Sequence, residues 1–274
     1  MESERMDDLE ALRTIERVRQ RSSARGSAYE WVNVWFGVLL GLYIGLLTTL
    51  TAIAEDPAVT QMMIAALVLH SAILEGAREH SGVRRGLRAG DIIMLVASLV
   101  LIVSSLALSI LVSLPAWSGA VVGAVGAAVF AAAPAVRLQR MQRSAAASGR
   151  TTTAEWPTEP LSRSARILTA AAAALLGAIA VGQGHPVASL GILLLVIVAM
   201  FVALAAKESP WSLARVGMEW GRGHWAAFGL SVLLLLGDVA LIALAGPQTL
   251  PVALAIGVVV AAPVALSALP RRAR

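Results

Sequence analysis

Residues 233–244 read LLLLGDVALIAL and place one carboxylate, Asp238, inside a run of aliphatic side chains. Charged side chains are almost never fully buried in soluble proteins without a partner. In a lipid bilayer, an aspartate at a helix centre costs about 2.5–3.5 kcal/mol on insertion scales. The meaning of Asp238 therefore depends on whether water or lipid surrounds this stretch.

The composition indicates that lipid surrounds this stretch. Of the 274 residues, 58% are hydrophobic and 14% are charged, whereas soluble domains carry about 25% charged residues. Several apolar runs reach roughly 20 residues, the length of helix that crosses the hydrocarbon core of a bilayer. Backbone groups in lipid must be hydrogen-bonded internally, so these runs predict helices. We predict an all-α polytopic membrane protein with eight transmembrane helices, at 34–53, 58–75, 92–113, 118–136, 166–182, 187–206, 226–245 and 250–269.

The basic residues lie on one side of these predicted spans. Lys207, the only lysine, and the arginines lie in the N-terminus, the loops 76–91, 137–165 and 207–225, and the C-terminus, except Arg166 at the start of a predicted span. The other four loops hold neither residue, and basic loops stay in the cytoplasm. We therefore predict that both termini are cytoplasmic. The arginine and alanine bias is typical of bacteria with GC-rich genomes, and the acidic N-terminus lacks a signal-peptide pattern. The predicted location is the bacterial cytoplasmic (inner) membrane.

Four predicted spans precede a Ser/Thr/Pro-rich stretch and four follow it. The predicted organisation is a cytoplasmic N-terminal helical segment at 1–30, a four-span half at 31–137, a cytoplasmic linker at 138–165, and a second half at 166–274 with a basic tail. The halves would share one orientation, as in parallel repeats. Both a duplication of parallel four-helix halves and a plain series of hairpins agree with this pattern.

The loop 207–225 contains ESPWSLARVGMEW, which predicts a short amphipathic helix. Ser209 is the expected N-cap, and Pro210 suits the first helical position. Arg215 and Glu219 share one face, and Trp211 lies on a neighbouring apolar strip. Two interpretations remain, a helix that ties two spans together and a helix that docks a cytoplasmic partner.

Small and polar residues recur inside the predicted spans. Glycines at a spacing of four let helix backbones approach closely, which predicts packing seams at Gly37, Gly41, Gly45, Gly119 and Gly123. A candidate intramembrane polar path comprises Asp238, His70, Ser98, Ser105 and Ser109. Each has a structural alternative. The serines can bond their own helix backbone, His70 can be a hydrogen-bonded packing residue, and Asp238 can be a protonated partner in an interhelical hydrogen bond.

Motifs of several chemistries are absent from the sequence. There is no GxxxxGK[ST], HExxH, CxxC or GxSxG, and no cysteine for disulfides or thiolate metal sites. We therefore predict that the chain is not an enzyme, has no catalytic, cofactor-binding or metal-binding residues, and needs no cofactor. The basic charge is explained by membrane topology, so no nucleic-acid partner is predicted.

The first 110 residues resemble, in layout, the membrane subunits of ABC-2-type exporters. LEALRTIERVRQR precedes the first predicted span, as the cytoplasmic surface helix does in that family, which typically has six spans. LEGAREHSGVRRGLRAGD fills the loop that in the family docks on a separate ATPase. The resemblance, together with the helix in 207–225, implies docking by Glu75, Arg78, Glu79, Arg84, Arg85, Arg88, Trp211, Arg215 and Glu219.

These patterns favour the permease-type subunit of a transporter, an exporter of an apolar or amphipathic substrate. Its expected partners are the lipid bilayer and a cytoplasmic ATPase subunit or other membrane subunits, with a homo-oligomer as the alternative assembly. Two other functions agree with the sequence. One is a proton- or cation-coupled carrier that uses Asp238, and the other is a scaffold that holds partners at the membrane without transport.

Overall fold

In the computed structural model the described residues are mostly helical and include no strand. The described residues are 2–53, 58–80, 115, 117–147, 154–185, 209 and 211–270, with individual residues at 100–104 and 188–199. Five helices are long and apolar enough to cross a membrane, with apolar spans at Ala24–Thr49, Ser118–Ala147, Arg163–Gly184, Arg222–Ala245 and Leu250–Ser267. The all-helical prediction is confirmed for the described residues, and the five helices agree with a multi-pass membrane protein without establishing the count of eight.

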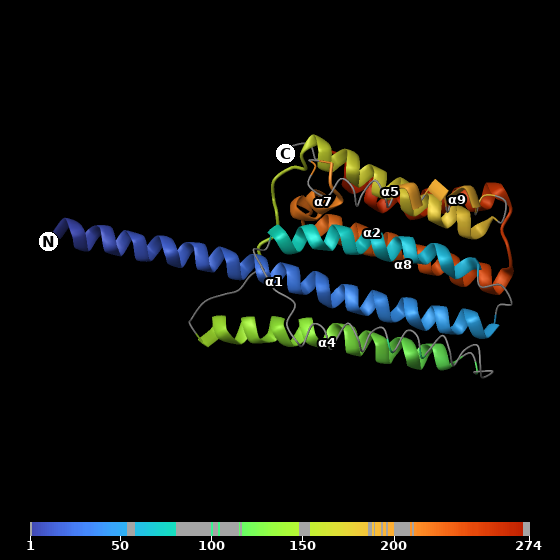
Figure 1. Ribbon diagram of the computed structural model, residues 1–274, viewed down its shortest axis with the longest axis horizontal. Coiled ribbons are helices and arrows are strands. Elements are labelled where there is room, and N and C mark those ends of the chain that lie inside the picture. The colour runs from blue at the N-terminus through green and yellow to red at the C-terminus, as the bar shows by residue number, and fades with distance from the viewer. Residues whose placement is uncertain are drawn as a thin grey trace.

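The long helices run side by side in layers (Figure 1). Helix α1 (Glu2–Ile53) projects beyond the bundle at its N-terminus and packs along α4 (Ser118–Ala147). On its other side lie α2 (Ala58–His80) and α8 (Arg222–Ala245). In the next layer, at the top of Figure 1, α5 (Arg163–Gly184) packs on α9 (Leu250–Ser267). The short α7 (Leu213–Glu219) crosses the end of α2.

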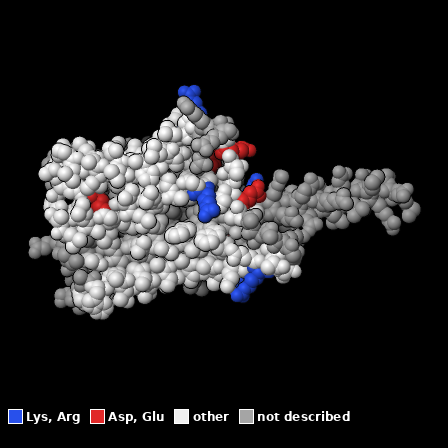
Figure 2. Space-filling model, turned by 180° about the vertical axis from the view of Figure 1, so that it is seen from behind, with Lys and Arg blue, Asp and Glu red and all other residues white. Residues whose placement is uncertain are grey.

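The side chains separate as a bilayer requires. Ile44, Leu176 and Leu235 are fully buried between the helices. In contrast Leu244 and Val258, on α8 and α9, are 81% and 70% exposed. Large exposed apolar surface of this kind is a liability in water and is expected where lipid covers it. Figure 2 shows charged side chains gathered toward the end from which α1 projects, called the charged end here. The opposite end is called the apolar end.

Several helices continue past the ends of the predicted spans. The predicted segment 1–30 and first span are one continuous helix, α1. The first ten residues of the predicted linker 138–165 belong to α4, which continues to Ala147 because RLQRMQRSAAA is rich in strong helix formers. Helix α2 extends to His80 and is not among the five apolar spans. Most of the third predicted span, 92–113, and much of the sixth, 187–206, lie outside the described residues.

The seam between α1 and α4 is a backbone contact. A Cβ added at Gly37 would lie 2.6 Å from the backbone nitrogen of Ala131, and one at Gly45 would lie 2.6 Å from the carbonyl oxygen of Gly119. Gly41 meets Ala127, and Gly123 faces Gly45. The five glycines predicted to pack thus line one interface. An ion pair closes its charged end, where Arg137 Nε lies 3.1 Å from a carboxylate oxygen of the buried Glu30.

We predict that Gly41→Ala destabilises the bundle by about 1–3 kcal/mol, because a methyl group must push two helix backbones apart. The measurement is thermal unfolding of the purified protein in mild detergent. Gly229→Ala on α8 is the matched control, since a Cβ there meets nothing within 4 Å. Equal unfolding midpoints for both variants would contradict close backbone packing of α1 against α4 at Gly41.

Candidate functional site

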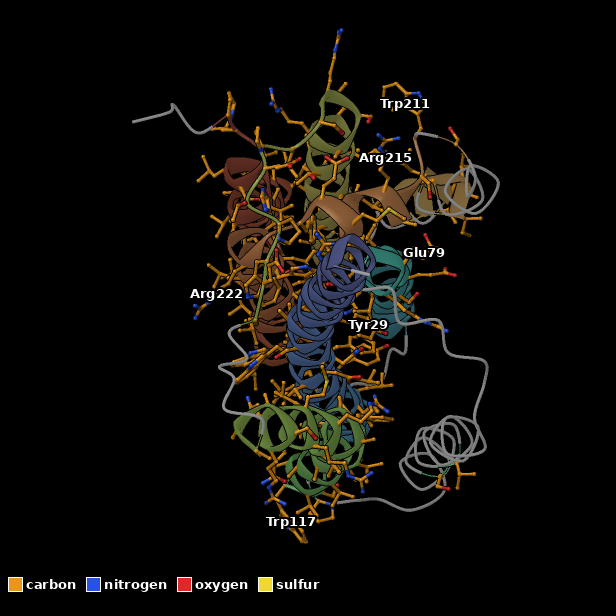
Figure 3. All side chains as sticks on the ribbon, turned by 90° about the vertical axis from the view of Figure 1, so that its left-hand side faces the viewer. Tyr29, Glu79, Trp117, Trp211, Arg215 and Arg222 are labelled. Carbon is orange, nitrogen blue, oxygen red and sulfur yellow. The ribbon has the colours of Figure 1, made fainter. Side chains whose placement is uncertain are left out.

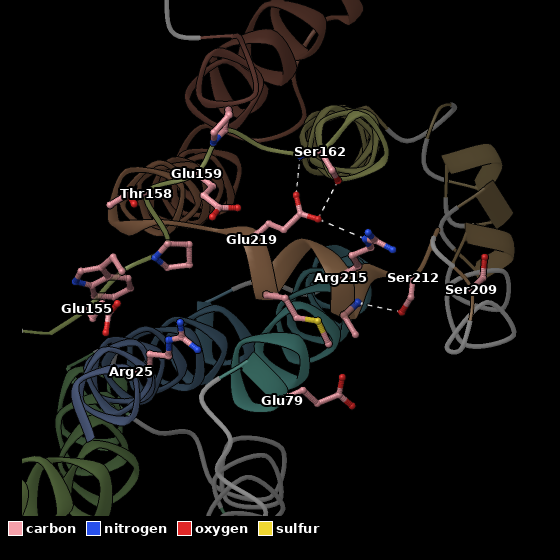
Figure 4. A pocket seen from close by; sticks show the side chains of 15 residues that line it. Arg25, Glu79, Glu155, Thr158, Glu159, Ser162, Ser209, Ser212, Arg215 and Glu219 are labelled. Carbon is pink, nitrogen blue, oxygen red and sulfur yellow. Dashed lines mark hydrogen bonds and ion pairs between the residues drawn. The ribbon is translucent and has the colours of Figure 1, made fainter. Parts of the chain in front are cut away.

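A cleft of about 660 Å³ opens at the charged end of the bundle (Figure 4). Its walls come from α1, the end of α2, α7 and the irregular segment 154–162 that leads into α5. Charged side chains dominate its rim. The ionisable residues that line it are Arg25, Glu79, Glu155, Glu159, Arg215 and Glu219.

The first wall of the cleft exists because α7 crosses α2 at two glycines. A Cβ on Gly76 would collide with the backbone of Ala214, and one on Gly217 would collide with the carbonyl of Ile73. This contact brings together two segments that are about 140 residues apart in the sequence. Figure 3 looks onto this end and shows Glu79 and Arg215 on the same side of α1, away from Arg222.

Glu219 fixes the second wall. Its two carboxylate oxygens accept hydrogen bonds from the backbone nitrogen of Ser162 at 2.7 Å and from the Ser162 hydroxyl at 2.8 Å. Ser162 is the N-cap of α5, where free N–H groups and the helix dipole favour a negative charge. Arg215 lies 3.4 Å from the same carboxylate. Glu219 is therefore a structural acceptor that joins α7 to α5.

The segment 154–162 closes the cleft as a packed strap. The backbone nitrogen of Glu155 donates to the carbonyl oxygen of Ala24 at 3.2 Å, and Gly221 packs against the carbonyl of Pro157. Leu161 is buried in the core. The sequence pattern predicted only a linker here. It therefore did not predict that Glu155 and Glu159 of this segment, and Arg25 of α1, line a cleft. The Trp-Pro pair beside Glu155 was the one signal of packing.

The structure brings together three of the predicted docking residues, Glu79, Arg215 and Glu219. Glu75 and Arg78 lie on α2 but do not line the cleft, and Trp211 is 51% exposed outside it. Arg84, Arg85 and Arg88 lie outside the described residues. The predicted N-cap Ser209 was wrong. Helix α7 begins after Ser212, whose hydroxyl accepts from the Ala214 N–H at 3.2 Å.

His70 belongs to an aromatic cluster in the core. Its ring stacks on Phe36 with centroids 4.2 Å apart and lies 5.2 Å from the ring of Phe228. Trp220 and Trp225 complete the cluster, and the Trp220 indole donates to a threonine hydroxyl of α5 at 3.0 Å. Phe228 lies ten residues before Asp238, about 15 Å along α8. The structure therefore separates His70 from Asp238.

Asp238 lies near the apolar end and is 4% exposed. Its Oδ1 accepts a hydrogen bond from Gln248 Nε2 at 2.7 Å, and the Gln248 backbone nitrogen donates to Gly184 O at 2.8 Å. Ser98, Ser105 and Ser109 of the candidate path lie outside the described residues. Among the residues that are described, no group of three or more His, Cys, Asp or Glu side chains is arranged to hold a metal ion.

Comparisons with protein-family models, with curated proteins and with solved structures found no match to this chain. The geometry of the cleft and of the Asp238 environment is therefore the basis for the functional argument.

We predict that Glu219→Ala destabilises the fold by about 1.5–3 kcal/mol, because hydrogen bonds to a charged acceptor at the α5 N-terminus are lost. Glu159→Ala, on the same rim but exposed, should leave stability unchanged. Thermal unfolding of both variants tests this. A double-mutant cycle with Ser162→Ala should give a coupling energy above about 0.5 kcal/mol. Additive effects of the two substitutions would contradict a direct interaction between Glu219 and Ser162.

Proposed function

We propose that this chain is the membrane subunit of a transporter and that the charged end faces the cytoplasm, where the cleft receives a separate partner. One observation carries the proposal. The two segments predicted from sequence to dock a partner, 76–91 and 207–225, meet in space through their described residues, at Gly76 and Gly217. Docking segments that act together must lie on one surface, and these two form one wall of a single cleft.

The charge of the cleft indicates the chemistry of the partner. Glu79, Glu155 and Glu159 are exposed on the rim and form no ion pair with another described residue. Arg215 is engaged by Glu219, which leaves Arg25 as the opposing cation of the rim. Complementary charge steers association and fixes orientation. The docking element of the partner therefore carries lysine or arginine.

The resemblance in layout to ABC-2-type exporters supports an ATPase as this partner. In this proposal the cleft couples ATP hydrolysis in the partner to movement of the membrane helices in a bacterial cytoplasmic membrane. The exported substrate is apolar or amphipathic, in keeping with the apolar helices that surround any route between the two membrane faces.

The test is affinity purification of the tagged full-length protein from its native membrane in mild detergent, with bound proteins identified and quantified by mass spectrometry. We expect a stoichiometric ATPase. The triple variant Glu79→Gln/Glu155→Gln/Glu159→Gln should lower its recovery at least tenfold. Glu75→Gln is the matched control, because Glu75 lies one turn before Glu79 on α2 but does not line the cleft.

Recovery should also fall as salt rises, because exposed charge pairs are screened. Purification of the chain alone would remove the proposal. So would an ATPase whose recovery is the same with the triple variant and the wild type. Unfolding midpoints measured on the same samples separate loss of docking from loss of fold.

A further inference from the structure

The strongest unexplained feature outside the cleft is the polar group around Asp238 at the apolar end. Gln248 reaches from the loop 246–249 to Asp238 and is held in turn by its backbone bond to Gly184. Its side-chain oxygen lies against Gly184, since a Cβ added there would be 2.6 Å from Gln248 Oε1. The loop between α8 and α9 is thus fastened to both α8 and α5.

Several polar atoms of this group have no hydrogen-bond partner among the described residues. They are Asp238 Oδ2, Gln248 Oε1, both side-chain polar atoms of Gln183, and His185 Nδ1. Gln183 is 7% exposed. It lies on the same side of α5 as the fully buried Leu176 and Thr169, at steps of seven. Its neighbour Gly184 accepts the hydrogen bond from the Gln248 backbone. Gln183 therefore projects toward the interior of the bundle near the level of Gln248.

Unpaired buried acceptors require an explanation, because each costs about 1–3 kcal/mol relative to a satisfied one. Three of the unpaired atoms are oxygens, and oxygen is the ligand that hard cations prefer. Asp238 supplies the only charge among the described residues of the apolar end. A monovalent cation would neutralise that single carboxylate, whereas a divalent cation would leave a net charge in a medium of low dielectric constant.

We propose that Asp238, Gln248 and Gln183 form a binding site for a monovalent metal cation, with sodium as the ion to test. Asp238 Oδ2 and the two amide oxygens, Gln248 Oε1 and Gln183 Oε1, are the ligands. The hydrogen bond from Gln248 Nε2 holds the carboxylate in place. This site lies at the opposite end from the cleft, and it does not depend on a partner that docks there.

The experiment uses full-length protein in mild detergent. Thermal unfolding is followed from 0 to 200 mM NaCl, with choline chloride keeping the ionic strength constant. Binding to the folded state alone raises the midpoint, and roughly 2–5 °C is expected at a tenfold excess over the dissociation constant. Equilibrium binding of ²²Na⁺ gives the second readout, with one ion expected per chain.

Three variants and one control locate the site. Asp238→Asn removes the charge, Gln248→Leu removes an oxygen ligand, and Gly184→Ala displaces Gln248 Oε1 while keeping every ligand. Each should abolish the sodium-specific shift and lower ²²Na⁺ binding at least tenfold. Glu159→Gln removes an acid at the charged end and should change neither measurement. If Asp238→Asn does not fold, Gln248→Leu and Gly184→Ala keep the test decisive.

The proposal is overturned if sodium and choline give the wild type the same midpoint, or if Asp238→Asn keeps the shift. A protonated carboxyl predicts another pattern. In that case the wild type is insensitive to sodium and Asp238→Asn, which has nearly the same shape, is as stable as the wild type. That result would also overturn the cation site.

Discussion

Close approach of helix backbones at glycine is the constraint on which the rest of this structure depends. Lipid offers little hydrophobic drive for one apolar helix to leave it for another, so helix association needs close packing. Glycine permits that packing in three places. Gly41 and its neighbours join α1 to α4, Gly177 and Gly257 join α5 to α9, and Gly76 with Gly217 joins α2 to α7. The third contact builds the wall of the cleft.

Polar interactions then select the register that the glycines allow. Arg137 Nε donates to both carboxylate oxygens of the buried Glu30, and this contact fixes α4 along α1. The Trp220 indole bound to Thr169 and the Glu219 carboxylate bound to Ser162 fix α7 and the start of α8 against α5. All three lie at the charged end. A misplaced helix would leave these groups unpaired, which is more costly than the modest net gain from pairing them.

The hydrophobic pattern predicted the helices well, because a span must be apolar along a length set by the bilayer. The four-residue glycine spacing in α1 and α4 likewise predicted a close interface. Gly76 and Gly217 gave no such signal, because each acts alone in a crossing contact. The extension of α4 past Arg137 has no apolar signal, because the helix leaves the apolar span there and continues through residues of high helix propensity.

The candidate sites were predicted unevenly for a related reason. Sequence identified Asp238 through its rarity, since one carboxylate among aliphatic residues stands out. It did not identify Gln248 or Gln183, because an amide beside a loop is ordinary until the fold turns it inward. In the same way, charge in the loops identified Glu79 and Arg215, but Arg25 and Glu155 join the cleft only because the strap 154–162 crosses α1.

Helix α8 connects the two ends of the molecule. Its first turn follows directly on α7 and the cleft, and Asp238 lies about 24 Å farther along the same helix. Between them the hydroxyl of Ser231 is buried and has no partner among the described residues. In the two proposals above, α8 links the docking cleft to the cation site, because it follows α7 at one end and carries Asp238 beside Gln248 at the other. Coupling of this kind is reciprocal. If a docked partner changes the sodium affinity of the Asp238 site by some factor, sodium changes the affinity of the cleft for that partner by the same factor.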